Sequence, residues 1–150
     1  MKLKVIFFFT LFYCLAGDDV SGQSVMGKWK TYDVFDNTIE ESIVDIYKFE
    51  NQLFIKIDKI IPEEHINDLC INCKGKDKDQ PVLGMIILEG AVFHEGVWQG
   101  AQILNAKNGK RYGCHISLEE NDLLKVRGFV GYPFFGKTLF WTRVKDSEYR

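Results

Sequence analysis

The chain has 150 residues, 46% of them hydrophobic and 14% aromatic, which gives room for one domain and lies far from the composition of disordered or collagen-like proteins. Of its 19 basic and 21 acidic side chains, the first 16 residues hold only Lys2 and Lys4, which leaves 17 against 21 and a formal net charge of −4. This acidic balance disfavours nucleic acid as a partner.

The first 16 residues predict an export signal. Lys2 and Lys4 form a positively charged start, residues 5–15 are apolar but too few to cross a bilayer, and Ala16 offers a small residue for cleavage. Cleavage after Gly22 fits the same pattern. We therefore expect an exported protein, periplasmic or secreted, in which residues 17–150 form one domain without a transmembrane span.

Short runs of alternating apolar and polar residues begin at Val25, and such runs are typical of half-buried antiparallel strands. The alternation predicts eight strands, at residues 25–33, 41–49, 52–60, 82–89, 97–104, 110–118, 123–131 and 136–145. Without helices to cover them, these strands would expose costly edges unless the sheet closed on itself. The sequence therefore predicts an all-β fold, a single antiparallel eight-stranded up-and-down barrel.

The turn residues predict how the strands connect. Asn108-Gly109 suits a tight hairpin because both residues accept positive φ, and Glu50-Asn51 is a weaker hairpin signal. One long interruption, at residues 61–80, starts with Pro62 and two acids, which favour a single helical turn. Long loops of this kind are often functional.

Alternation also proposes which side chains point into the barrel. One strand places Leu53, Ile55 and Ile57 on the same face, and another does so for Tyr112, Cys114, Ile116 and Leu118. From these faces and a neighbouring strand we predict five residues that would contact a ligand: Ile55, Ile57, Tyr112, Ile116 and Val126. The same side chains could simply fill the barrel, because eight-stranded interiors are either packed solid or hold one small ligand.

Two short tryptophan motifs lie at the two ends of the strand-rich region, and they predict how the barrel is sealed. Trp29 follows Gly27 on the first strand, and Arg143 follows Trp141-Thr142 on the last. An arginine can stack on an indole face while donating hydrogen bonds to nearby carbonyls, which would fasten the last strand to the first.

These motifs resemble those of the lipocalin and fatty-acid-binding barrels, and a longer set resembles the bacterial family catalogued as domain of unknown function 2147. The matching segments are Gly27-Lys28-Trp29-Lys30-Thr31, Cys70-Ile71-Asn72-Cys73-Lys74-Gly75, Gln80-Pro81-Val82-Leu83-Gly84, Asn108-Gly109-Lys110, Lys125-Val126-Arg127-Gly128 and Trp141-Thr142-Arg143. The resemblance implies an exported bacterial protein with a lipocalin-like barrel, and it implies no activity. Two turns depart from the family pattern, Asn105-Ala106 and Glu50-Asn51.

Cys70 and Cys73 have three interpretations. An oxidising compartment favours a disulfide between them that tightens the long loop, with Cys114 either buried as a free thiol or paired with one of them. A redox-active dithiol would need a stabilised thiolate, and no helical pattern follows Cys73 to supply one. A zinc site would draw on His65, Cys70, Cys73 and either Cys114 or His115, but the spacing lacks a second close pair. We therefore predict no metal site.

Two further residues, His94 and Arg127, are candidate functional groups. His94 lies beside Glu95, but no nucleophile-elbow, metalloprotease or glycine-rich phosphate signature accompanies it, so we expect an exposed loop histidine and no enzyme. Arg127 falls on the outer face if Val126 points inward. With the opposite face assignment it would be an interior charge and would mark an anion contact.

The sequence thus favours a barrel that binds a small apolar or amphipathic ligand in the bacterial envelope, without a cofactor. The alternative is a structural or interaction module, with a barrel filled by side chains and a loop at residues 61–80 that contacts another envelope protein. A third hypothesis is a thiol or zinc site at Cys70 and Cys73.

Overall fold

The computed structural model describes residues 24–149, so the predicted export signal lies outside the described part of the chain. Its strands are β1 (Gly27–Tyr32), β2 (Glu40–Phe49), β3 (Gln52–Ile60), β4 (Ile86–His94), β5 (Val97–Asn105), β6 (Lys110–Glu120), β7 (Leu123–Phe129) and β8 (Gly136–Arg143). Three short 3-10 turns accompany them, η1 (Glu63–His65), η2 (Gly75–Asp77) and η3 (Asp146–Glu148). In residues 24–149 there is no helix of the length and apolarity that a membrane crossing requires.

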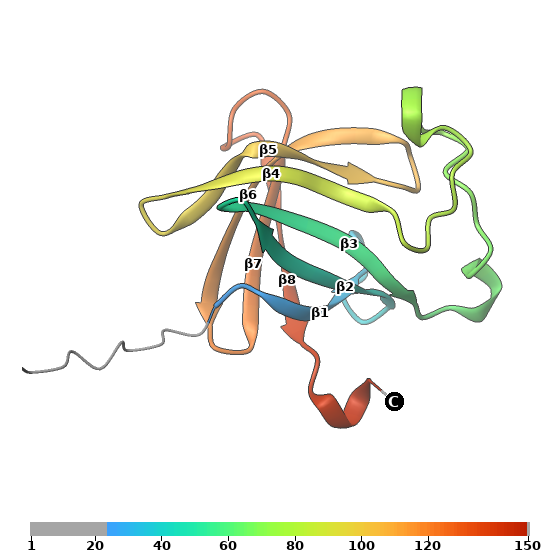
Figure 1. Ribbon diagram of the computed structural model, residues 1–150, viewed down its shortest axis with the longest axis horizontal. Helices are drawn as coiled ribbons and strands as arrows, with labels where there is room; N and C mark the ends of the chain where they lie inside the picture. The colour runs from blue at the N-terminus through green and yellow to red at the C-terminus, as the bar shows by residue number, and fades with distance from the viewer. Residues whose placement is uncertain (1–23, 150) are drawn as a thin grey trace, which may run out of the picture.

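The strands form one closed barrel in the order of the sequence, each antiparallel to its neighbours (Figure 1). β1 and β8 complete the ring, where Trp29 pairs with Arg143 and Lys30 with Thr142. Closure pairs the main-chain N–H and C=O groups that an open sheet would leave without hydrogen bonds at its edges. The predicted eight-stranded up-and-down barrel is therefore confirmed.

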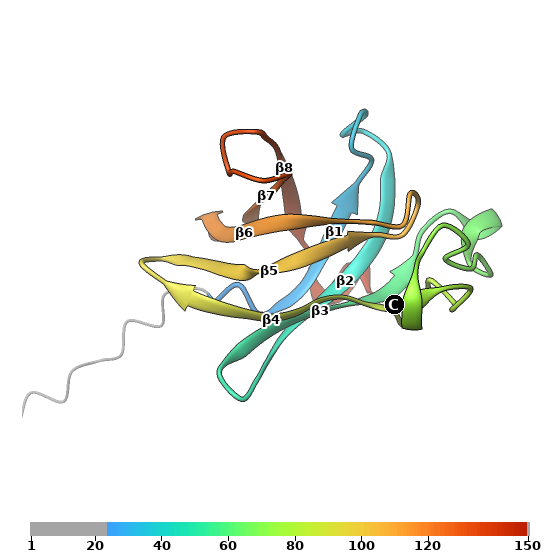
Figure 2. The ribbon, with the colours of Figure 1, turned by 90° about the horizontal axis from the view of Figure 1, so that it is seen from above.

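The up-and-down order gives the barrel two ends, which we call the base and the mouth. The base carries residues 24–26 and the three hairpin turns at 50–51, 95–96 and 121–122. The mouth carries the β1–β2 loop (33–39), the long loop (61–85), the β5–β6 turn (106–109) and the β7–β8 loop (130–135). The β1–β2 and β7–β8 loops stand clear of the barrel on the same side (Figure 2).

The inward-facing side chains are packed most tightly near the base. Trp29, Ile46, Leu53 and Leu124 are almost completely buried there, within one apolar cluster. Strand alternation explains which residues of each strand are buried, because these inward residues are followed by outward ones that are polar or more exposed. Leu53, Ile55 and Ile57 share the inner face as predicted, as do Cys114 and Ile116.

The fourth strand differs from its prediction at residues 82–89. Residues 82–84 belong to the long loop, and β4 begins at Ile86 and continues to His94. Gly90, with φ +81°, forms a bulge opposite β3, so that Leu88 and Ala91 both face inward although they are three residues apart. A bulge breaks the two-residue alternation from which the strand was predicted.

The Glu50-Asn51 turn keeps the geometry of a tight hairpin without glycine. Glu50 has φ +48° and Asn51 φ +63°, the left-handed pair of a type I′ turn. Asparagine tolerates this conformation much better than glutamate does. We expect Glu50→Asn to raise the free energy of unfolding by roughly 0.5–1 kcal/mol. Urea denaturation would measure it, with the exposed Glu120→Asn as the control, since Glu120 is not among the residues with positive φ.

Candidate functional site

The base is sealed by the residues that the sequence singled out for closure. The guanidinium of Arg143 lies 4.2 Å from the centre of the Trp29 ring. Its Nη1 donates to the Met26 carbonyl at 3.0 Å, and its Nη2 to the Ser24 carbonyl at 2.8 Å. Arg143 therefore joins β8, β1 and the segment before β1, and this end offers little access to the interior.

Gly27 and the Trp29 indole complete this seal. Gly27 has φ +115°, and a Cβ there would lie 3.3 Å from Nη1 of Arg143. The indole Nε1 of Trp29 donates to the Val25 carbonyl at 2.8 Å and is fully buried. The geometry makes Gly27, Trp29 and Arg143 structural groups.

The inner surface is more accessible toward the mouth. Ser42, Ile103, Tyr112 and Leu139 occupy inward register positions and are half-buried. Deeper in the barrel, Ile55, Ile57, Ile116 and Val126 are buried in one apolar cluster. Four of the five predicted ligand-facing residues thus lie in the buried cluster, and Tyr112 lies above them at the mouth.

A belt of small residues crosses the inner wall between the row of Ile103 and Tyr112 and the row of Ile116, Val126 and Leu139. Ala101, Cys114 and Gly128 pair directly across β5, β6 and β7. A Cβ added to Gly128 would meet only the Cβ of Tyr112, at the ordinary contact distance of 3.8 Å. Small side chains leave space that larger ones would occupy. This belt and the half-buried residues on either side of it are the part of the interior best suited to hold a small molecule.

One buried donor in the interior has no partner. The indole Nε1 of Trp141, on β8, makes no hydrogen bond within residues 24–149, and Trp141 is paired with the fully buried Leu124. Buried N–H groups without an acceptor are rare because their desolvation is costly. The Trp141 N–H is therefore suited to donate to an acceptor atom of a bound molecule.

A charged cluster ties loops together across the mouth. Nζ of Lys107, on the β5–β6 turn, donates to Asp33 Oδ2 at 3.1 Å and to Glu41 on β2. β2 and β5 are not neighbours in the barrel, so this clasp spans the opening. Sequence reasoning missed it, because Asp33 and Lys107 are 74 residues apart and no local pattern pairs them.

Hydrogen bonds and burial set the protonation of this clasp. Backbone N–H donors of Phe35 and Asp36, together with Lys107, hold the pKa of Asp33 far below its usual range. Burial raises the pKa of Glu41 despite its bond to Lys107. Asp33 therefore contributes stability above its unfolded pKa of about 4, which is lost as the pH falls. Glu41 acts in the opposite sense, and its contribution is lost as the pH rises through its raised pKa.

This opposition can be measured by carboxyl-detected NMR titration. We expect Glu41 to titrate above its ordinary value and Asp33 below it. In Lys107→Met the pKa of Asp33 should rise toward its ordinary value, because one of its charged donors is removed. An unchanged Asp33 titration in that variant would contradict the clasp.

Known proteins resemble this barrel in sequence family and in fold. The family described as "Uncharacterized protein conserved in bacteria (DUF2147)" matches residues 27–143. The chain belongs to this family. A solved structure, titled "Protein HP1028 from the human pathogen Helicobacter pylori belongs to the lipocalin family", superposes with a TM-score of 0.72 at 16% identity. The match covers 83% of this chain and 86% of that one, and it supports a lipocalin-like fold. The search of curated proteins gave no match.

In this DUF2147 barrel the long loop packs on the outside of the wall. Cys70 and Cys73 are joined by a disulfide and are both buried. The sulfur of Cys70 lies 3.3 Å from the Ala106 carbonyl oxygen, and Asn72 Nδ2 donates to the Lys107 carbonyl at 2.9 Å. In the disulfide neither sulfur is a free thiolate that could bind zinc, whereas a redox-active pair would also be a disulfide in its oxidised form. In residues 24–149 no cluster of three His, Cys, Asp or Glu side chains could hold a metal ion.

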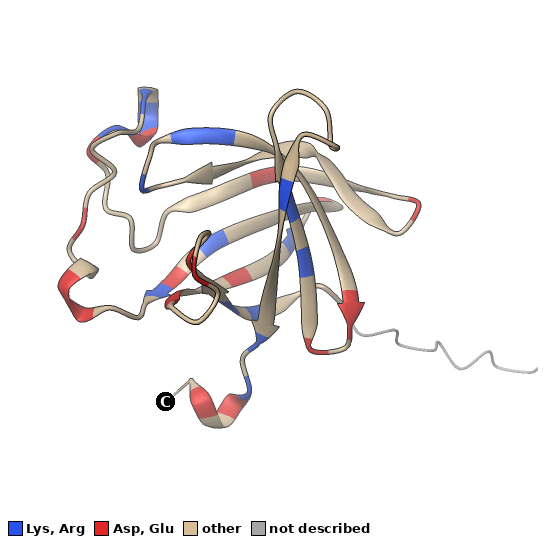
Figure 3. Ribbon diagram, turned by 180° about the vertical axis from the view of Figure 1, so that it is seen from behind, with Lys and Arg blue, Asp and Glu red and all other residues tan. Residues whose placement is uncertain are grey.

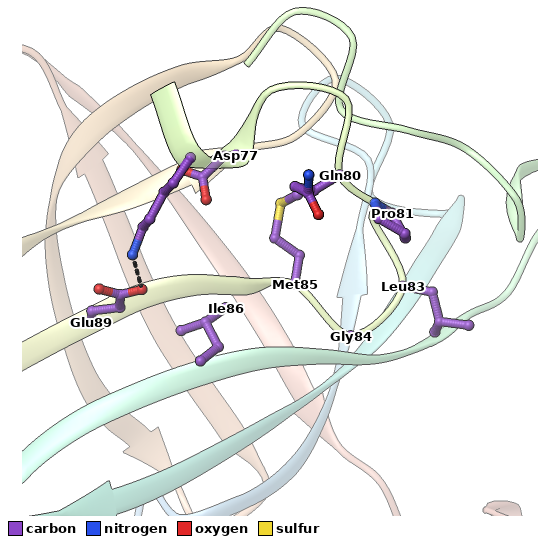
Figure 4. Close-up of a pocket in the computed structure, with 9 residues that line it drawn as sticks. Asp77, Gln80, Pro81, Leu83, Gly84, Met85, Ile86 and Glu89 are labelled. Atoms are coloured by element: carbon purple, nitrogen blue, oxygen red, sulfur yellow. Dashed lines mark hydrogen bonds and ion pairs between the residues drawn. The ribbon is translucent and has the colours of Figure 1, made fainter. Parts of the chain in front are cut away.

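Two open depressions lie beside this loop. The first, of about 350 Å³, separates the loop from β4 and includes Gln80, Met85 and Glu89 (Figure 4). The second includes Arg111 and Gln102. Their charges are already paired, Lys76 with Glu89 at 2.9 Å and Arg111 with Asp77 at 2.6 Å. The paired charges leave these depressions with few free polar groups for a ligand.

Cys114 gives a direct chemical test of this cysteine arrangement. It is free and buried, and burial raises its pKa to about 12. We expect negligible reaction with Ellman's reagent in the folded protein near neutral pH. Protein whose N-terminus lies beyond Cys14 should show one thiol in denaturant and three after reduction. Three thiols without reduction would contradict the disulfide.

Arg127 lies on the outer face of β7, between the inward-facing Val126 and Gly128. Its Nε donates to the Pro133 carbonyl at 2.6 Å and its Nη1 to Thr138 Oγ1 at 2.9 Å. An anion contact inside the barrel would require Arg127 to point inward, so the structure does not support that contact. Arg127 instead holds the β7–β8 loop.

His94 and Glu95 lie at the base, at the tip of the β4–β5 hairpin. His94 Nε2 is 3.7 Å from Glu95 Oε2, and both side chains are mostly exposed. His94 ends strand β4, rather than lying in a loop. The pair is at the opposite end of the barrel from the accessible inner surface.

Proposed function

We propose that this protein binds a small apolar or amphipathic ligand in the mouth half of its barrel. The observation that carries the proposal is that Ser42, Ile103, Tyr112 and Leu139 on the inner wall are only half-buried. Their neighbours Thr31, Ile60 and Leu88 are buried, so the accessible part of the wall is local. The apolar part of a ligand would rest on Ile103 and Leu139. Sites of this kind are largely apolar with a few placed polar groups.

The polar groups of the inner wall favour an amphipathic ligand within this class. The Trp141 N–H lacks an acceptor within residues 24–149 and lies level with Leu124, toward the base, so the polar end of a ligand would have to reach below the small-residue belt to meet it. The Tyr112 hydroxyl lies at the mouth, where it accepts from Asn108 Nδ2 at 3.0 Å. A carboxylate, ester or phosphate oxygen would satisfy the indole N–H. We also propose that the protein acts in the bacterial envelope, without catalysis, because the predicted export signal and the lack of a catalytic signature in the sequence both favour a carrier.

Native mass spectrometry of protein purified without added lipid would test occupancy directly. Titration with a dansyl-labelled fatty acid then measures affinity. Gly128→Leu should fill the small-residue belt and weaken binding by roughly tenfold or more. Ser117→Leu, on the outer face of β6, is the matched control and should leave binding unchanged. Equal affinity in both variants would overturn the proposal.

Trp141→Phe separates the two ligand classes. The substitution keeps an aromatic ring and removes the N–H, so an amphipathic probe should bind several-fold more weakly. A purely apolar probe should bind at least as well as before. If both probes respond equally, the indole N–H does not contact the ligand.

A second candidate function is a structural or interaction module of the envelope. It is favoured by the packed base and by the disulfide-closed long loop, which exposes Ile66, Leu69 and Ile71. An envelope protein would then bind this loop. Pull-down with wild type and Ile71→Ser would test it, with Phe49→Ser at the base as the control, and loss of a partner with unchanged ligand content would favour this function.

A further inference from the structure

The β7–β8 loop exposes an apolar cluster that the ligand site does not use. Its members are exposed by about two thirds of their surface: Val130 (68%), Tyr132 (67%), Phe134 (69%) and Phe135 (65%). No charged residue occurs between Arg127 and Lys137, and Figure 3 shows this loop without acidic or basic colour. Exposed apolar clusters of this kind mark contact surfaces.

The loop is built to hold these side chains outward. Arg127 donates to the Pro133 carbonyl at 2.6 Å and to the Phe134 carbonyl at 3.3 Å. Within the loop, the Val130 N–H donates to Phe135 O at 3.3 Å, and the Phe135 N–H to Tyr132 O at 3.0 Å. The main chain is thereby fixed, so the aromatic rings cannot easily fold back onto the barrel.

The β1–β2 loop adds a second apolar point on the same side. Phe35 is 92% exposed, and its ring lies 5.0 Å from Nζ of Lys137, which also donates to the Val34 carbonyl. Both loops reach a similar height in Figure 2, above the rest of the barrel. A flat surface laid against that side would therefore touch both loops.

The area of the cluster bears on what it contacts. Four aromatic side chains of about 200 Å² each, exposed by two thirds or more, would bury roughly 600 Å². A stable protein interface needs about 800 Å² from each partner, so a second copy or a protein partner would be weakly held by these loops alone. Binding to a bilayer has no such threshold of area, because each ring that is inserted adds its own favourable free energy of burial.

We propose that the β7–β8 loop, together with Phe35, docks the barrel onto the surface of a phospholipid bilayer. The aromatic rings would enter the interfacial layer, where such side chains are enriched in membrane proteins. Arg127 and Lys137 flank the loop, and once the rings are inserted they would lie near the lipid phosphates and complement their charge. Asp33 and Asp36 on the neighbouring loop already accept hydrogen bonds, from Phe35 and Thr38 N–H respectively. The two acidic residues balance Arg127 and Lys137 in formal charge, so docking rests on the aromatic rings and does not require anionic lipid.

Vesicle flotation tests the docking without any added ligand, so it is independent of the proposed carrier function. Phosphatidylcholine vesicles are mixed with the exported protein, whose N-terminus is established by intact mass, because residues 5–15 are themselves apolar. We expect wild type to float with the vesicles. The double variant Phe134→Ser/Phe135→Ser should lower the partition coefficient by roughly tenfold or more.

Phe49→Ser/Phe93→Ser is the matched control. These two phenylalanines are also exposed, by 60% and 59%, but they lie at the base. The control should float like wild type, and circular dichroism should show all three proteins folded. Equal loss in both variants, or no flotation of wild type, would overturn the proposal.

A direct measure of depth complements the flotation. Phe134→Trp places a new indole in the loop, and its fluorescence should shift to shorter wavelength on vesicles and be quenched by brominated phosphatidylcholine. Size-exclusion chromatography with light scattering tests whether a second copy of the chain binds the loop instead of a bilayer. A dimer that Phe134→Ser/Phe135→Ser dissociates, in a protein that does not bind vesicles, would assign the loop to a second copy and overturn the bilayer.

Discussion

Arg143→Gln is expected to lower the free energy of unfolding by about 2–4 kcal/mol, because it removes a stacked cation and charged hydrogen bonds together. Arg143 contacts the Trp29 ring and donates to the carbonyls of Ser24, Met26 and Asn121. Arg143→Lys should recover only a small part of the loss, since an ammonium lacks the planar fork. Urea denaturation followed by tryptophan fluorescence would measure both.

Arg127→Gln is the matched control for this loss. Arg127 also donates to carbonyl groups, but it lies on the outer face and joins only a loop to its own hairpin. We expect its substitution to change the free energy of unfolding by about 1 kcal/mol or less. Equal losses at the two positions would mean that the seal at the base has no special role.

Gly109→Ala is expected to detach the long loop from the wall. An added Cβ would lie 1.9 Å from the Asn72 main-chain oxygen and 2.7 Å from the Cys73 nitrogen, and Gly109 has φ +70°. Because the clashing atoms are main-chain atoms beside a disulfide, they cannot move away alone. We expect a loss of roughly 3 kcal/mol or more, with faster amide exchange at Cys70 and Val82.

Gly75→Ala separates conformational strain from the clash. Gly75 has a similar φ of +60°, but a Cβ there would meet nothing within 4 Å. This variant should lose only about 1 kcal/mol, the strain of the left-handed conformation. A loss at Gly109 no larger than at Gly75 would show that the contact between the loop and the β5–β6 turn is not close in solution.

The features predicted correctly from the sequence depend on local patterns. Alternation located eight strands, and an oxidising compartment favoured the disulfide that joins Cys70 and Cys73. The structure places Arg143 on the Trp29 ring, the pairing considered for closure. Each of these signals lies within a few residues or repeats a known side-chain pairing. The fold was therefore the most predictable part of the molecule.

The features that were missed depend on contacts between distant segments or on main-chain irregularity. The clasp of Lys107 with Asp33 and Glu41 joins loops that only the closed barrel brings together. The bulge at Gly90 interrupts the alternation, so the predicted fourth strand ended at residue 89 whereas β4 continues to His94. The exposure of the β7–β8 aromatic residues depends on Arg127, whose outward direction followed from alternation but whose carbonyl partners did not.

The junction of β1 with β8 has a kinetic consequence. Only two residue pairs align there, whereas β7 and β8 align over seven. Beyond the Arg143 seal, few main-chain bonds hold these two strands together, so transient opening of the cylinder should begin at the mouth end of this line while the other junctions stay intact. Amide protons of β1 that face β8 should therefore exchange with solvent earlier than those of β7.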